Sequence, residues 1–189
     1  MFAFTLHGLT PVKAEPYPFT ELQRNWLDAL RSGKYEQGQG FLKDKHNRYC
    51  CLGVLCELAG LDSRLMEAAK AFQWKEKDNN VFHFSTGFIP SSVRALAGLY
   101  GDLGHFTQGI KFPGIKYGPQ PDTMELGIGS NHCSLGAMND ARCLDAPGNT
   151  KRAFNFKEIA DYIEFDPWNV FKAPEDMAKE AALYRLNAA

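Results

Sequence analysis

Three of the five cysteines lie within seven residues, at Cys50, Cys51 and Cys56 in the stretch RYCCLGVLCELAG. Cysteine thiolates attack electrophiles and bind zinc, so a cluster of this kind indicates possible chemistry. The stretch predicts a strand that leads into a helix beginning at Cys51. A helix N-terminus favours a thiolate through its dipole and its free N–H groups. Cys51 is therefore the candidate nucleophile.

A catalytic set can be assembled around Cys51 from residues far along the chain. It comprises His132 as the base, Asn139 or Asp140 as the group that orients it, and Gln37 or Gln39 as the donor to an oxyanion. The order of glutamine, helical cysteine and histidine resembles papain-like cysteine hydrolases or transferases. The sequence around Cys51 does not match their active-site motif.

The alternative is that these cysteines pack in a core as small apolar residues, and we favour it because cysteine is among the residues most often buried. A metal site is disfavoured by the spacing. On a helix Cys51 and Cys56 stand about 140° apart. Cys133 and Cys143 are separated by nine residues, and the five histidines are scattered. We therefore expect neither a metal nor a cofactor.

Two capping boxes mark the clearest helix starts. Thr20 with Gln23 opens one helix, which we expect to end near Gly33, and Asn155 with Glu158 opens another near the end of the chain.

Residues 51–59 predict a central helix buried on nearly every side, because Glu57 is its one charged residue. Gly60 and Leu61 predict a Schellman-type stop. Short strands are predicted at 35–42 and 48–50, where Gly38 and Gly40 suit a bulge or the close approach of another backbone. The remaining predictions are helices at 63–72, 90–98, 133–140 and from Pro174, and a hairpin of Trp74 with 81–84.

These elements show no βαβ rhythm and predict an α+β fold, with a small antiparallel sheet or hairpins around the buried central helix. We expect a single domain over 1–189, with an extended N-terminal arm at 1–18, a Gly-rich loop at 101–130 and a C-terminal helical extension at 174–187.

The Gly-rich loop is the candidate binding segment, because long loops in compact domains usually serve function. Its aromatic residues can form a lid or rim, and the polar pair that follows can begin an anion-binding helix. The candidate ligand-binding residues are Phe106, Phe112, Tyr117, Ser130 and Asn131. The glycines of QGQG and GIGSNH match neither a Walker nor a dinucleotide motif.

Composition disfavours several classes of function. A net charge of −1 disfavours a nucleic-acid binder, which needs a dense field of Lys and Arg. No run of 18 apolar residues is present, so we expect no membrane span. The first 18 residues lack the basic n-region of a signal peptide, and the odd cysteine count suits free thiols in a reducing cytosol.

Several segments together resemble a family of small bacteriophage and prophage proteins of uncharacterised activity. They are WLDALRSGKYEQGQGFLK, RYCCLGVLCELAG, FIPSSVRALAGL, LGAMND and FNFKEIADYIE. The chain departs from the family's pattern in its Gly-rich loop, in the insertion at 141–153 and at Met138. The resemblance implies synthesis in the cytoplasm of an infected bacterium.

The leading hypothesis is a non-catalytic binding protein that acts on a host protein, or on a small metabolite or nucleotide, in host take-over or counter-defence. The alternatives are the cysteine enzyme described above and a subunit of a larger phage assembly, held through the Ala-rich C-terminal segment. The oligomeric state is left open.

Overall fold

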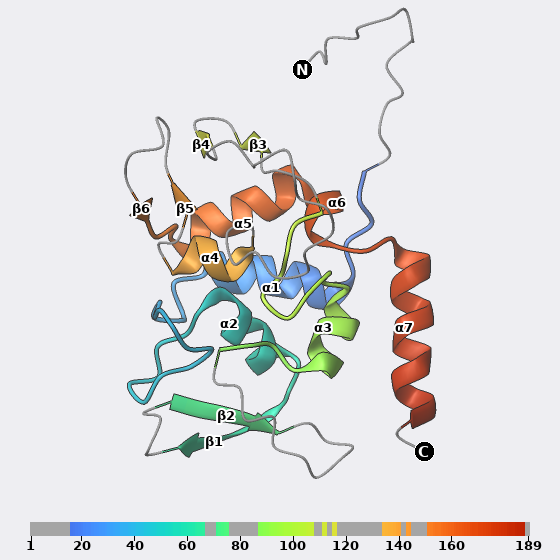
Figure 1. The fold of residues 1–189 in the computed structure, drawn as a ribbon, viewed down its shortest axis with the longest axis horizontal. Helices are drawn as coiled ribbons and strands as arrows, with labels where there is room; N and C mark the ends of the chain where they lie inside the picture. The colour runs from blue at the N-terminus through green and yellow to red at the C-terminus, as the bar shows by residue number, and fades with distance from the viewer. Residues whose placement is uncertain are drawn as a thin grey trace, which may run out of the picture.

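The computed structural model describes residues 16–66, 71–75, 87–107, 111–112, 115–116, 134–140, 143–144 and 151–187. The elements are α1 (Glu21–Arg31), α2 (Cys51–Leu58), β1 (Asp62–Met66), β2 (Ala71–Lys75), α3 (Ser91–Ala97), β3 (Lys111–Phe112), β4 (Ile115–Lys116), α4 (Leu135–Asn139), β5 (Cys143–Leu144), β6 (Lys151–Arg152), α5 (Phe156–Phe165), α6 (Pro167–Val170) and α7 (Pro174–Asn187). Helices with three small antiparallel strand pairs confirm the α+β prediction (Figure 1).

Four helices enclose the core. Helix α1 packs against α2 and α5, and α4 packs against the same two helices. Every residue from Cys51 to Cys56 is buried, so α2 is the central helix that the sequence predicts. The indole N–H of Trp26, which is fully buried, donates to the Cys51 carbonyl over 2.8 Å and fastens α1 to the first turn of α2.

The predicted helix ends are confirmed in detail. Capping boxes close the N-termini of α1, at Thr20, and α5, at Asn155. At the end of α2, Gly60 has φ +71°, its N–H donates to Glu57 and the Leu61 N–H donates to Cys56. These two bonds make the Schellman motif that the sequence predicts, with glycine in the left-handed conformation it requires.

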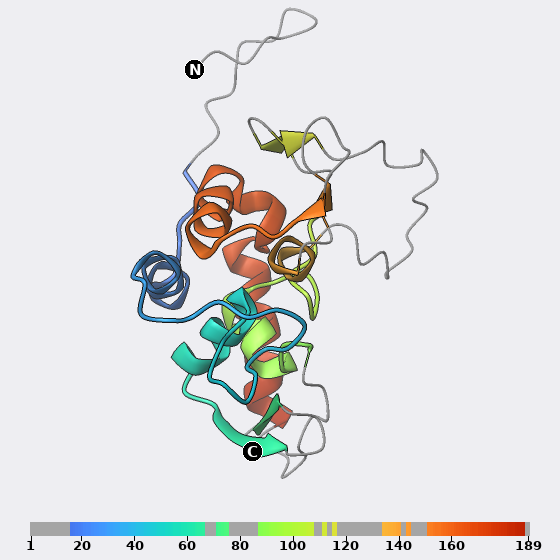
Figure 2. The same ribbon diagram turned by 90° about the vertical axis from the view of Figure 1, so that its left-hand side faces the viewer.

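The helix predicted at 63–72 is wrong. Residues Asp62–Met66 and Ala71–Lys75 form the antiparallel pair β1–β2, with Asp62 opposite Lys75 (Figures 1 and 2). The stretch is rich in helix-forming residues, but tertiary contacts decide its conformation. The Phe72 N–H donates to the Lys43 carbonyl over 2.9 Å, which ties β2 to the preceding loop.

The predicted hairpin of Trp74 with 81–84 stays a prediction. Within the described residues, Trp74 lies in β2 and pairs with Ser63 of β1. Residues 81–84 lie outside the described part of the chain. Trp74 is nonetheless buried, which places β2 against the core.

The strands predicted at 35–42 and 48–50 reduce to isolated bridges. Gln37 pairs with Tyr49 in parallel and Lys43 pairs with Tyr49 in antiparallel fashion. The loop therefore wraps round Tyr49 instead of forming a ladder. The predicted close approach at Gly38 is confirmed, since a Cβ there would lie 3.0 Å from the Arg48 Cβ and 3.3 Å from its carbonyl carbon.

Helix α7 packs against α3 at the side of the molecule (Figure 1). Glu180 on α7 forms ion pairs with Arg94 and Lys172. Buried Met177 lies against Gly98, which ends α3 with φ +70°. Within the described residues, no helix is both long enough and apolar enough to cross a lipid bilayer.

Position 53, the glycine of the CCLG motif, has no room for a side chain. A Cβ at Gly53 would lie 1.7 Å from the Leu42 carbonyl oxygen and 2.6 Å from its carbonyl carbon. Both neighbours are backbone atoms, which cannot turn aside as a side chain can. Helix α2 therefore rests directly on the main chain of the 35–50 loop.

We predict that Gly53→Ala lowers the free energy of unfolding by about 3 kcal/mol, since overpacking against backbone exceeds the gain in helix propensity of about 1 kcal/mol. Gly136→Ala in α4 is the control, because its added Cβ would first meet the flexible Leu103 side chain, at 3.3 Å. Urea denaturation checks both variants. Equal stabilities for the two would contradict the prediction.

Candidate functional site

Cys51 faces the core. Its side chain is fully buried, and its S–H donates to the Leu135 carbonyl over 3.6 Å. Burial, reinforced by Cys50 and Asp140, raises the pKa of the Cys51 thiol well above its usual range. The thiol is thus held protonated, away from solvent. This environment opposes a nucleophilic role, and the candidate base His132 lies outside the described residues.

The other cysteines of the cluster also serve packing. Cys50 caps α2, since its Sγ accepts the Gly53 N–H over 3.4 Å, and burial raises its pKa to about 12. Cys56 is fully buried. Across the described residues, no three His, Cys, Asp or Glu side chains gather in a way that could hold a metal ion. The three cysteines of RYCCLGVLCELAG are therefore part of the core.

Asn139, at the end of α4, joins three segments through its fully buried carboxamide. Its Nδ2 donates to the Gly38 carbonyl over 2.8 Å and to an Asp140 carboxylate oxygen over 3.0 Å. Its Oδ1 accepts from Gln37 Nε2 over 3.0 Å and from the Cys51 N–H over 3.3 Å. Loop 37–40, α4 and the start of α2 therefore share one polar centre.

The main chain extends this network. The Asn139 carbonyl accepts from Gln39 Nε2 over 3.3 Å, and Asp140 Oδ1 accepts the Gly40 N–H over 3.0 Å. The structure thus brings together five of the six residues proposed as catalytic, Gln37, Gln39, Cys51, Asn139 and Asp140. Their contacts are those of a structural network, in which each polar group bonds another part of the chain.

A cleft of about 460 Å³ opens beside this network. It is lined by Gln37, Gly38, Gln39, Arg48, Ala153, Phe154 and Asn155. Gln37 donates both hydrogens of its amide, one to Asn139 and one to the Phe154 carbonyl over 2.8 Å. The carboxamide therefore has a fixed orientation at the wall of the cleft.

Arg48 is held at the cleft by Asp44. Its Nε donates to Asp44 Oδ2 over 2.8 Å, and its Nη2 lies 2.6 Å from the same oxygen. Burial acts to raise the pKa of the Asp44 carboxyl, but hydrogen bonds from Arg48 and from the His46 N–H outweigh it, so the pKa is lowered. Arg48 therefore presents a guanidinium whose charge is already paired.

Of the residues predicted to bind ligand, the structure places Phe106 away from the cleft. Phe106 is half-buried and packs edge-on against Tyr162, with ring centroids 5.1 Å apart. Phe112 pairs with Ile115 in the β3–β4 hairpin. Tyr117, Ser130 and Asn131 lie outside the described residues, so their role stays a prediction.

The sequence analysis did not place Arg48 and Asn155 at a candidate site, although both line the cleft. One signal was available, the alternation Gln-Gly-Gln-Gly at 37–40, which places two carboxamides on the same side of an extended segment. The other wall of the cleft comes from residues more than 100 positions later, and nothing local indicates that pairing.

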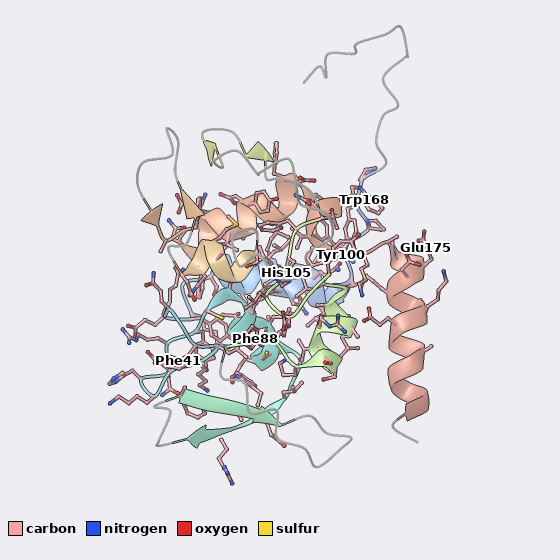
Figure 3. The ribbon with its side chains drawn as sticks, in the orientation of Figure 1. Phe41, Phe88, Tyr100, His105, Trp168 and Glu175 are labelled. Atoms are coloured by element: carbon pink, nitrogen blue, oxygen red, sulfur yellow. The ribbon has the colours of Figure 1, made fainter. Side chains whose placement is uncertain are left out.

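A second hollow, of about 240 Å³, lies between α3 and α7 on the other side of the molecule. Its lining is mainly apolar: Thr20, Ala95, Leu96, Pro174, Met177 and Ala178. Figure 3 shows exposed Tyr100 and Trp168 toward that side, whereas Phe41 marks the loop that borders the cleft. The cleft is the better candidate site, because several hydrogen-bonding groups converge on it.

We predict that Asn139→Asp lowers the free energy of unfolding by about 2–4 kcal/mol at pH 8, because a buried carboxylate faces the Gly38 carbonyl and Asp140. The carboxyl would have a raised pKa when folded, so the loss shrinks as the pH falls and the protonated acid again donates to Gly38. Urea denaturation at pH 5 and pH 8 measures this.

The matched control is Asn155→Asp, which replaces an exposed helix cap with another good cap. We expect its stability to stay within about 0.5 kcal/mol of the parent at both pH values. A stable Asn139→Asp protein at pH 8 would contradict the central role of the Asn139 carboxamide.

We also predict slow alkylation of Cys51 in the native protein. Its thiol is fully buried and its pKa is raised, so iodoacetamide at pH 8 should label it about 100-fold more slowly than in the urea-unfolded chain. Peptide mass spectrometry resolves each cysteine. Native labelling of Cys51 at the unfolded rate would instead revive the nucleophile hypothesis.

Comparison with protein families matches residues 19–166 to DUF8296, a domain of unknown function. No curated protein and no solved structure matches the chain. All seven residues that line the cleft fall inside the matched span, whereas three residues of the apolar hollow, Pro174, Met177 and Ala178, lie beyond it. Because the match covers well over half of the chain, the protein belongs to the DUF8296 family.

Proposed function

We propose that this chain is a non-catalytic binding protein that takes a small polar molecule in the cleft beside Asn139. One observation carries the proposal: fixed hydrogen-bonding groups converge on a cleft of about 460 Å³. That volume falls within the range of about 300–1,000 Å³ found for small-molecule sites.

The cleft is organised before any ligand arrives. Gln37 is held by two hydrogen bonds, Gln39 by one and Arg48 by its ion pair with Asp44. Groups that are already ordered lose little conformational entropy on binding, so more of the contact energy appears as affinity. This supports a site built for recognition.

The chemistry of the lining favours binding over catalysis. Its polar side chains are carboxamides and one guanidinium, which donate and accept hydrogen bonds but exchange no protons near neutral pH. The thiol of Cys51, the candidate nucleophile, is buried with a raised pKa. A cysteine hydrolase or transferase would require a thiolate facing the substrate.

The setting of this function follows from the resemblance to bacteriophage and prophage proteins. In an infected bacterial cytoplasm, a small binding protein can withdraw a host metabolite or nucleotide, in take-over or counter-defence. The alternative, a host protein as the partner, requires a surface outside the cleft. These two cases are separated by experiment.

A blocking variant tests the proposal. Ala153 lines the cleft, so Ala153→Leu fills part of it. We expect small molecules that copurify with the parent protein, identified by mass spectrometry, to be lost from Ala153→Leu. Leu96→Ala in the apolar hollow is the control and should retain them, with melting temperatures confirming that both variants fold.

Two outcomes would contradict the cleft proposal. One is that no molecule copurifies and no metabolite or nucleotide raises the melting temperature. The other is that a ligand binds Ala153→Leu as well as it binds the parent. Capture of one host protein by both variants would then favour the protein-partner alternative.

A further inference from the structure

We infer that the ligand of this cleft is a neutral planar heterocycle with two adjacent N–H donors beside a carbonyl acceptor, the pattern presented by guanine. The inference rests on the proposed binding function and goes further by naming the ligand class. It follows from which atoms of the lining are already bonded and which are left to face a ligand.

Gln37 supplies one acceptor. Both hydrogens of its amide are used, toward Asn139 Oδ1 and the Phe154 carbonyl. Because the nitrogen contacts two acceptors, the amide has one consistent orientation. Its Oε1 receives no hydrogen bond from any residue in the described part of the chain, so it is left to accept from a ligand.

Gln39, which also lines the cleft, supplies a second acceptor. Its Nε2 donates to the Asn139 main-chain carbonyl. Both carboxamides therefore bond the same residue, one to its side chain and one to its backbone. Among the described residues none donates to Gln39 Oε1. A ligand with two N–H groups would satisfy both of these oxygens, which are called the acceptor pair, because both glutamines line the cleft.

The backbone N–H and carbonyl of Gly38, between the two glutamines, both form hydrogen bonds within the protein. The Gly38 carbonyl accepts from Asn139 Nδ2 over 2.8 Å, and its N–H donates to the Tyr49 carbonyl over 2.7 Å. A Cβ at Gly38 would lie 3.0 Å from the Arg48 Cβ. This glycine lets the two carboxamides and Arg48 approach one another, but it offers the ligand no polar group.

Arg48 supplies a hydrogen-bond donor whose positive charge is balanced by the Asp44 carboxylate. Its Nε and Nη2 face the Asp44 carboxylate. A phosphate would meet a guanidinium whose charge is already paired with Asp44, whereas a carbonyl needs only the remaining N–H groups of the guanidinium.

Guanine combines the required groups on one edge: the N1–H and N2–H donors and the O6 acceptor. Adenine presents an acceptor where guanine presents the N1–H. Inosine keeps N1–H and O6 but lacks the exocyclic amine, so one glutamine oxygen would stay unpaired. A buried polar group left unpaired by a ligand costs affinity strongly.

Calorimetric titration of the full chain tests the ligand class with guanosine, inosine, adenosine and GMP. We expect guanosine to bind at least about tenfold more tightly than inosine or adenosine, because each lacks a donor that the acceptor pair requires. GMP should bind within about threefold of guanosine, and its affinity should change little between low and high salt, since no phosphate contact is made.

Gln39→Met tests the acceptor pair itself. Gln39 is exposed, and methionine keeps its length without the oxygen. We expect the ratio of guanosine to inosine affinity to fall toward one. A purely structural effect of the substitution would weaken both nucleosides equally and leave that ratio unchanged, which would overturn the inference.

The failures of the two proposals are distinguishable. If guanosine and inosine bind equally, and both are lost in Ala153→Leu, the cleft binds ligands but the guanine pattern is wrong. The same holds if a copurifying anion binds the parent but not Ala153→Leu. If no small molecule depends on Ala153, the binding function and the ligand class fail together.

Discussion

The buried carboxamide of Asn139 is the interaction on which the candidate site depends. It satisfies an N–H at the start of α2, a carbonyl of the 37–40 loop and the amide of Gln37 in a single residue. Carboxamides suit such a junction because they donate and accept at once. An aspartate or a leucine of similar size would leave several buried groups without partners, and each such group costs about 1–3 kcal/mol.

Burial and the helix dipole have opposite effects on the ionisation of the thiols in the cysteine cluster. A helix N-terminus stabilises a negative charge by up to about 2 kcal/mol in favourable sites. The pKa of Cys50 rises from 9.0 to about 12, which corresponds to roughly 4 kcal/mol against its thiolate. Burial therefore outweighs the dipole at the start of α2. The helix N-terminus that suggested a nucleophile instead receives the neutral oxygen of Asn139.

Local rules predicted much of the fold. The capping boxes at Thr20 and Asn155, the stop at Gly60 and the buried character of α2 follow from short-range chemistry, and the structure confirms them. The prediction at 63–72 failed because helix propensity is a weak preference, and pairing of β1 with β2 overrides it. The cleft was missed for a related reason. Its walls join Gln37 to Asn139 and Phe154, pairs separated by 102 and 117 residues, so no window of sequence contains the site.

The same long-range geometry gives the CCLG motif a role in shaping the candidate cleft. Helix α2 packs directly against the backbone of Leu42. The Leu42 carbonyl accepts the Cys50 N–H over 3.1 Å, and it occupies the space that a side chain at Gly53 would need. From the other side, Asn139 holds Gly38 and Gln37. The loop that carries both glutamines is therefore fixed between the central helix and α4. Compact, uncharged residues at 50–53 permit this close approach, so the motif that suggested catalysis serves to position the carboxamides of the cleft.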